Sequence, residues 1–404
     1  MKQTMKHLTY LLMGALVTLS ACTKEKKIKT LKDEVVTNYA DLVYASYEDS
    51  YDKAVELKTA VNTLVATPTQ TNFNAAKTAW KAAREPYGQT EAYRFYDGPI
   101  DDADGPEGDL NAWPLDENYI DYVRDGSGGT VNNGIIGDVT NHPIINKTTI
   151  AALNEKGGEK NISIGYHAIE FLLWGQDHLD VNVNAGQGGD RLYTDYTSTA
   201  ANYQRRGEYI NACAELLVET LAELKAEWAD GGSYRTSFLA LDADEAITKI
   251  LAGIGILSKS ELAGERMFVA LEANAADNPQ EDEHSCFADN THRDIITNAQ
   301  GINNVLAGVY VNSAGTTIGD ADKSILKLLE EIDEDQAASL SAAMADAMTK
   351  VNAIPTPFDK YVTEETVSSN GPILQAINAL RTQGDNIAET ATALGLTIST
   401  DLPE

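Results

Sequence analysis

Apolar residues recur every three or four positions along almost the whole chain, and this spacing constrains the fold more than any other feature. From Asp33, the residues Val36, Tyr39, Val43 and Tyr47 fall on one face of a helix. Comparable spacing predicts helices over residues 72–81, 113–123, 165–174, 193–228, 242–275, 291–312, 321–331, 335–352 and 371–394. No stretch alternates with period two for long enough to predict a sheet. The chain is therefore expected to be all-α.

The N-terminus has the pattern of a bacterial lipoprotein signal. Two lysines precede an apolar run over residues 8–21, which is shorter than the ~20 helical residues that span a bilayer. The sequence LSAC at 19–22 resembles a lipobox, so signal peptide 1–21 would be removed and Cys22 would carry the lipid. Segment 22–32, rich in lysine, is expected to be an extended tether near the membrane. An ordinary signal peptide with a chance cysteine is the alternative.

The chain is strongly acidic, with 61 Asp and Glu against 31 Lys and Arg and a formal charge of −30 at pH 7. Removal of the predicted signal takes away two lysines and no acid, so the charge becomes −32. This charge argues against a nucleic-acid partner, because that affinity comes from basic side chains that neutralise phosphates. It suits a solvated surface or a cleft that attracts cations.

Two further features bear on organisation. Cys213 and Cys286 are far apart and form no metal box or disulfide framework, so buried free thiols are expected, with a single disulfide as the alternative. The glycine cluster at 186–190 is the predicted domain boundary, because few contacts should cross such a loop. It would separate helical domains 33–190 and 191–404.

The sequence GYHAIEFLLWGQD at 165–177 holds the main candidate site. On a helix, His167 and Glu170 are neighbours on one face, with Cβ atoms ~5–6 Å apart. They could bind a divalent metal together, or the carboxylate could orient the imidazole. The alternative is a structural histidine satisfied by a nearby glutamate, although two ionisable groups in so apolar a helix are costly unless paired or used. With one HxxE the pattern is neither the HExxH of zinc proteases nor a di-iron motif, so further ligands must come from elsewhere.

Two other segments carry chemically active residues. Glu91 and Arg94 have i,i+3 spacing and precede a run of aspartates that includes Asp101; a surface salt bridge is the alternative. Segment 280–292 concentrates two histidines, a cysteine and many acceptors, and a polar loop capping the next helix would explain much of it. A serine or cysteine nucleophile there is disfavoured, since no nucleophile-elbow pattern accompanies it.

Gly165, His167 and Glu170 form a GxHxxE motif that resembles that of the imelysin-like family, which includes an insulin-cleaving membrane protease and iron-regulated protein A. Further blocks resemble the family in the same order and cover roughly residues 35 to 395: Trp80 and Arg84 before Pro86-Tyr87 and Glu91, then 98–101, 111–115, 264–267 and 281–292.

The resemblance implies two α-helical domains, each related to a four-helix bundle, with a cleft at their junction. It also implies a bacterial envelope location and a link to iron acquisition. It assigns His167 and Glu170 as the metal or ligand site. The residues expected to line the cleft around this pair are Gly165, Tyr166, Glu91, Arg94, Asp101, Trp113 and Arg266.

Three functions follow from these patterns. The first is a non-enzymatic protein, lipid-anchored on the periplasmic face or the cell surface, that binds iron, zinc or a small metal-bearing ligand and works with envelope iron-transport partners. The second is a metallopeptidase in which Glu170 or Glu91 is the general base for a metal-bound water. The third is an adhesion or scaffold protein whose HxxE is structural.

Overall fold

A computed structural model describes residues 2–125, 127, 129–177, 186–273 and 283–402, with side chains from residue 24 onward. About two thirds of the chain is helical, 66%, and 3% is in strands. This confirms the predicted all-α class. The apolar faces expected from the sequence are the ones that are buried, since Val36, Tyr39, Val43 and Tyr47 are all at most 5% exposed.

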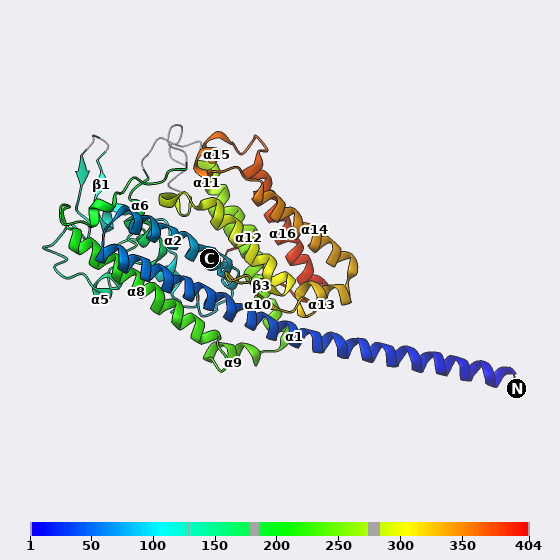
Figure 1. Ribbon diagram of the computed structural model, residues 1–404. Coiled ribbons are helices and arrows are strands. Elements are labelled where there is room, and N and C mark those ends of the chain that lie inside the picture. Colours follow the sequence, from blue (N-terminus) through cyan, green and yellow to red (C-terminus); the bar gives the residue numbers. More distant parts are fainter. Residues whose placement is uncertain (1, 126, 128, 178–185, 274–282, 403–404) are drawn as a thin grey trace.

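One group of helices forms around the long N-terminal helix, α1. In Figure 1, α1 runs from a free N-terminal arm into the body of the molecule, where α2 and α8 pack along it. Helix α6 lies against α2 and α8, and α5 and α9 also contact α8. The bounds of these helices are α1 Lys2–Ala66, α2 Gln70–Thr90, α5 Lys147–Ala151, α6 Gly165–Trp174, α8 Tyr203–Trp228 and α9 Ser233–Leu239.

A second group lies beside the first. Helix α14 packs along α16, the π-helix η3 packs on α16, and α12 packs against α2 and so joins the two groups. The bounds are α10 Ala243–Ile256, η3 Leu257–Phe268, α11 Val269–Ala273, α12 Thr291–Ala307, α13 Ile325–Ile332, α14 Glu334–Asn352, α15 Phe358–Glu364 and α16 Pro372–Ala393. One large hydrophobic cluster runs through both groups. Helix α8 follows the predicted boundary at residue 190 yet packs on α1 and α6; the division into two domains stays a prediction.

Short elements connect the helices. The helical ones are η1 Glu91–Tyr93, α3 Glu107–Leu110, α4 Glu117–Ile120, η2 Tyr193–Tyr196, η5 Cys286–Ala288 and η6 Ala321–Lys323. The strands form two small antiparallel hairpins, β1 Val123–Arg124 with β2 Thr130–Val131, and β3 Val309–Val311 with β4 Thr317–Gly319. In the second hairpin Tyr310 pairs with Ile318. These hairpins are too small to alter the helical class.

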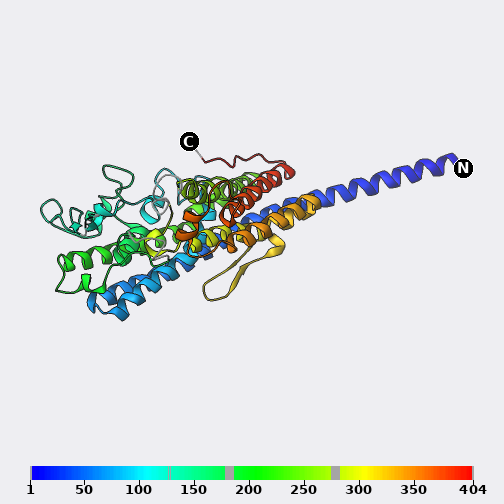
Figure 2. The ribbon, with the colours of Figure 1, turned by 90° about the horizontal axis from the view of Figure 1, so that it is seen from above.

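The predicted extended tether is wrong, because residues 22–32 are part of α1. The segment contains neither glycine nor proline, and lysine and glutamate are good helix formers. It also has an anchor on the body, since Leu31 is 7% exposed and Ile28 packs against the core. The first part of α1 projects beyond the other helices in both views (Figures 1 and 2).

Other helix ends differ from the prediction. Helix α2 starts earlier, because Thr69 caps it by accepting the Asn72 N–H at 3.2 Å, and it is not interrupted at Pro86. The predicted helix over 193–228 is broken: a 3-10 turn is followed by irregular chain, and α8 begins after Asn202 in a left-handed conformation. The π-helix η3 stands in the middle of the predicted 242–275 helix. At 113–123 only α4 is helical.

Two remaining expectations concern the cysteines and the membrane. Cys213 and Cys286 are buried free thiols, as predicted. Among the described residues, none of the helices combines the length and the apolar character needed to span a bilayer. The signal peptide, the lipidation of Cys22 and the membrane face stay predictions.

Candidate functional site

Helix α6 carries the GxHxxE motif through the centre of the fold. All ten of its residues are buried. Gly165 begins the helix with φ of +87°, and a Cβ there would lie 2.7 Å from the carbonyl oxygen of Leu110. Both conditions select glycine at this position. Gly175, with φ of +77°, ends the helix one residue after Trp174.

His167 and Glu170 face one another on α6, as their spacing predicted. The Nδ1 atom of His167 lies 2.8 Å from Oε2 of Glu170, and both side chains are fully buried. The other carboxylate oxygen, Oε1, accepts the N–H of Ala288 at 2.9 Å. Burial lowers the pKa of His167 and raises the pKa of Glu170, each well away from its usual value, so both uncharged forms are favoured. Glu170 therefore holds the imidazole ring through Nδ1.

An aromatic cluster surrounds the other side of the imidazole. The Trp113 ring lies 4.8 Å from the His167 ring, and the His284 ring lies 5.7 Å from it. Phe287 closes the cluster, 5.5 Å from Trp113. Nε2 of His167, Nδ1 of His284 and Nε1 of Trp113 are buried without a hydrogen-bond partner among the described residues. Unpaired buried polar atoms are costly, and here three of them gather around one ring.

Behind this cluster lies a buried ionic network centred on Glu91. Its carboxylate accepts from Nη2 of Arg266 at 2.6 Å, from Nη1 of Arg94 at 2.9 Å and from Nδ2 of Asn111 at 3.2 Å. Although burial opposes ionisation, the two guanidinium groups lower the pKa of Glu91 to about 2. The surface salt bridge considered for Glu91 and Arg94 is therefore wrong, since Glu91 is 1% exposed.

A second buried pair connects this network to the segment that covers Glu170. Arg84 on α2 donates Nη2 to Asp294 at 2.8 Å and Nη1 to Asn111 at 2.5 Å. Asp294 on α12 also accepts from the hydroxyl of Ser285 at 2.6 Å. Ser285 has a left-handed backbone, with φ of 58°, and lies three residues before Ala288. The position of the covering segment thus depends on the same charges.

The structure brings most predicted site residues together, with two qualifications. Asp101 lies outside the cluster: its carboxylate accepts the N–H groups of Phe95 and Gly98 and so closes a loop. Tyr166 points away toward Tyr87, with ring centres 4.7 Å apart, and its hydroxyl has no partner among the described residues. Sequence reasoning did not single out His284 individually, although it marked segment 280–292 that contains it.

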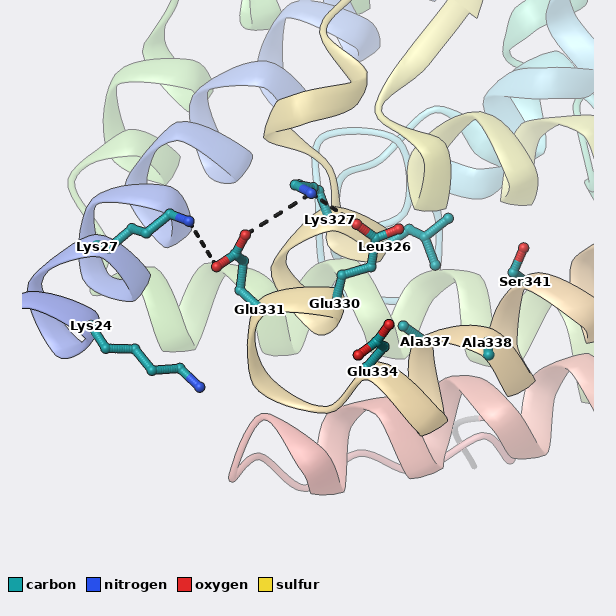
Figure 3. A pocket seen from close by; sticks show the side chains of 10 residues that line it. All are labelled: Lys24, Lys27, Leu326, Lys327, Glu330, Glu331, Glu334, Ala337, Ala338 and Ser341. Atoms are coloured by element: carbon teal, nitrogen blue, oxygen red, sulfur yellow. Dashed lines mark hydrogen bonds and ion pairs between the residues drawn. The ribbon is translucent and has the colours of Figure 1, made fainter. Parts of the chain in front are cut away.

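The space beside the site is small. A cavity of about 10 Å³, room for about one water, is lined in part by Trp113, Leu115, Cys286 and Phe287. A larger groove, about 790 Å³, lies between α1 at Lys24 and Lys27 and helices α13 and α14 (Figure 3). Several of its charges pair with one another, as Lys27 does with Glu331 at 2.8 Å and Lys327 with Glu330 at 2.9 Å. The groove contains none of the predicted site residues, so we place the candidate site at His167.

The nitrogen and oxygen atoms of the site differ in how well they could bind a metal. Nε2 of His167 suits iron or zinc, and the neighbouring Nδ1 of His284 is a second nitrogen of the same kind. Both oxygens of Glu170 are engaged, so in this conformation it is placed to orient His167 rather than to touch a metal. Among residues 24–402 that the structure describes, three or more His, Cys, Asp or Glu side chains do not gather in a metal-binding group.

Comparisons with known proteins identify the family. The imelysin family model matches residues 43–387. Iron-regulated protein A of Synechococcus elongatus is 26% identical over 347 residues, which are 86% of this chain and 82% of the relative. A solved structure from Parabacteroides distasonis, assigned as an iron-regulated protein A precursor, has a TM-score of 0.68 at 20% identity and covers 90% of this chain and 95% of its own. An imelysin-like protein from Psychrobacter arcticum has a TM-score of 0.61 at 14% identity, with 92% and 98% covered. The family model covers far more than half of the sequence, and this chain belongs to the imelysin family.

Proposed function

We propose that this protein binds iron, another divalent metal or a small metal-bearing ligand at His167 and serves iron acquisition in the bacterial envelope. The observation that carries the proposal is the unpaired Nε2 atom of a fully buried histidine. Its ring is held by Glu170, which is the arrangement that presents a histidine nitrogen to a metal. The name of the relative, iron-regulated protein A, supports iron as the first metal to test.

A ligand that brings its own donor atoms fits the site well. His167 supplies one free nitrogen, and Glu170 supplies orientation. A metal needs four to six ligands, so a chelated metal would arrive with most of them in place. Entry requires the segment from Ser285 to Asp289 to move, because Ala288 covers Glu170. Both end residues of that segment have left-handed backbones, with φ of 58° and 47°, which are uncommon for residues other than glycine.

The geometry favours binding over proteolysis. A general base should have a pKa near the working pH, whereas Arg266 and Arg94 lower the pKa of Glu91 to about 2. The other candidate base, Glu170, is engaged by His167 and by the N–H of Ala288.

The test is elemental analysis and metal titration of the protein purified without a histidine tag. His167→Ala should lose the metal, and Glu170→Gln should weaken its binding about 10- to 100-fold by removing the group that orients the ring. His142→Ala is the matched control, since His142 lies in the loop before α5 and takes part in none of the hydrogen bonds or ring contacts described for the site. Equal metal content in wild type and His167→Ala would refute the proposal.

We further propose that Cys22 carries a lipid that anchors the protein to the envelope, on the strength of the apolar run at 8–21 and the LSAC box. Radiolabelled palmitate should be incorporated into the wild type and not into Cys22→Ser. Cys213→Ser is the control because that thiol is buried. Incorporation that persists in Cys22→Ser would contradict the anchor.

A further inference from the structure

Two lysines of α2 share an aromatic surface at the end of α6. The ammonium of Lys77 lies 4.7 Å from the centre of the Phe73 ring and 4.9 Å from that of Trp174. The ammonium of Lys81 lies 5.7 Å from the same Trp174 ring. Because the lysines are four residues apart on a helix, they project from the same face. Both ammonium groups thus lie over Trp174, and that of Lys77 also lies over Phe73.

These lysines lack the acidic partners that are abundant elsewhere. Among the described residues, none of the ion pairs includes Lys77 or Lys81, although acidic residues outnumber basic ones by 61 to 31. A third cation, Arg191, stands nearby and is 4% exposed. Its Nη1 pairs with Asp121 at 2.7 Å, whereas Nε and Nη2 have no hydrogen-bond partner among the described residues. Burial, with repulsion from Lys81 and Arg191, lowers the pKa of Lys77 to about 8. The two lysine ammonium groups thus lie together over Trp174, and among the described residues neither forms an ion pair.

This cationic surface borders the candidate site. Trp174 follows Glu170 by one helical turn, so both lie on the same face of α6. The charge of Lys81 acts on Glu170, lowering its pKa against the larger effect of burial. Asp289, which also interacts with Lys81, is a weak counterion, because burial and neighbouring carboxylates raise its pKa to about 7. The lysines therefore stand beside Glu170 and the segment that covers it.

We propose that Lys77 and Lys81 form an anion subsite that binds the carboxylate groups of a metal chelate. This inference rests on the proposed function and narrows it: the ligand is an anionic chelate rather than a bare cation. The carboxylates would sit over α2 and the end of α6, and the metal would lie toward Nε2 of His167. Lysine suits this role as a point charge that accepts carboxylates in many orientations.

The test uses citrate alone, iron(III) citrate and iron(II) alone, titrated calorimetrically into the full mature chain. Lys77→Gln and Lys81→Gln should each weaken citrate and iron(III) citrate at least about tenfold, and leave iron(II) binding unchanged. Lys225→Gln is the matched control, because the Lys225 ammonium also lies over an aromatic ring, 4.2 Å from the centre of Tyr51, but on α8. Selective acylation of Lys77 at pH 8, suppressed by citrate in the wild type, gives a second readout without substitution.

The two proposals fail in different ways. If iron(II) binding requires His167 while citrate binding is the same in wild type, Lys77→Gln and Lys81→Gln, the anion subsite is refuted and the metal site stands. If citrate binding depends on the two lysines but iron binding does not depend on His167, the anion subsite stands and the metal site is refuted. Citrate affinity lowered equally by Lys225→Gln would also refute the subsite, because the effect would then be general charge.

Discussion

Replacing Arg266 by methionine should destabilise the protein strongly, because it leaves a buried carboxylate short of charge. Arg266 is 4% exposed and donates to Glu91, to Glu261 at 2.9 Å and to Asn298 at 2.8 Å. The pKa of Glu91 falls from 4.5 to about 2 in the folded protein, which corresponds to about 3 kcal/mol of stability at neutral pH. Arg266 is the largest favourable contribution to that shift, and breaking a buried pair typically costs about 3–5 kcal/mol.

The loss should depend on pH in a defined direction. A carboxyl whose pKa is lowered by folding stabilises the protein above its unfolded pKa, and this stabilisation disappears as the pH falls through the folded pKa. For Glu91 that window extends from about 4.5 down to about 2. The stabilisation of about 3 kcal/mol at pH 7 should decrease to about 1 kcal/mol at pH 3. The deficit of Arg266→Met relative to wild type should shrink accordingly.

Urea unfolding at pH 7 and pH 3 measures both effects. Arg293→Met is the matched control, because Arg293 makes an equally short bidentate pair with Glu85, at 2.8 and 2.6 Å, but both side chains are about 40% exposed. The control should cost only about 0–1 kcal/mol. Arg266→Lys retains the charge, so its loss of stability should lie between those of Arg293→Met and Arg266→Met. It replaces the methionine variant if that variant does not fold. Equal losses for Arg266→Met and Arg293→Met, or a deficit independent of pH, would refute the reasoning.

Three further outcomes are expected. Gly165→Ala should lower the free energy of unfolding by about 2 kcal/mol or more, since it combines a positive φ with a close backbone oxygen; an unchanged melting temperature would contradict this. Asp121→Asn should cost about 3–5 kcal/mol in urea unfolding, because the fully buried Asp121 carboxylate accepts from both Arg191 and Arg206 at 2.7 Å. A loss below about 1 kcal/mol would show that the charge of Asp121 does not hold the two arginines in place. Burial raises the pKa of the Cys213 and Cys286 thiols. In a Cys22→Ser variant, neither thiol should therefore react with a thiol reagent at pH 8 until the protein is unfolded.

The helical class and most helix positions could be predicted because they depend on local spacing. Helix α6 matches the predicted range of 165–174, since its apolar run is bounded by glycines at both ends. The errors lie where local patterns compete with tertiary contacts. Segment 22–32 was interpreted by composition as a tether, but Leu31 packs into the body and holds it helical. The helix expected from residue 193 starts ten residues later, where nothing in the local periodicity marks the interruption.

The site was predictable only where its residues are close in sequence. His167 and Glu170 are three residues apart, so helical geometry alone places them together. Arg266 and Glu91 are 175 residues apart, and only the family resemblance suggested that both lie near the motif. The contact of His284 with the His167 ring joins segments 117 residues apart in sequence, and no periodicity can indicate it.

This difference assigns separate roles to the two halves of the site. The local HxxE pair engages Nδ1 of His167 through Glu170, which leaves Nε2 as the ring nitrogen that other groups can meet. What Nε2 meets is determined by Trp113 and His284, which reach it from distant loops. Substitution of Trp113 or His284 should therefore change which ligand is preferred, even where His167 and Glu170 are retained.

We expect His284→Phe to alter the relative affinities for different metals and chelates. It should leave the melting temperature within a few degrees of wild type, because the phenyl ring has a similar shape and the Nδ1 atom that it removes has no partner among the described residues. A large stability loss without any change in relative affinities would show that His284 is structural, and that the motif alone determines the ligand.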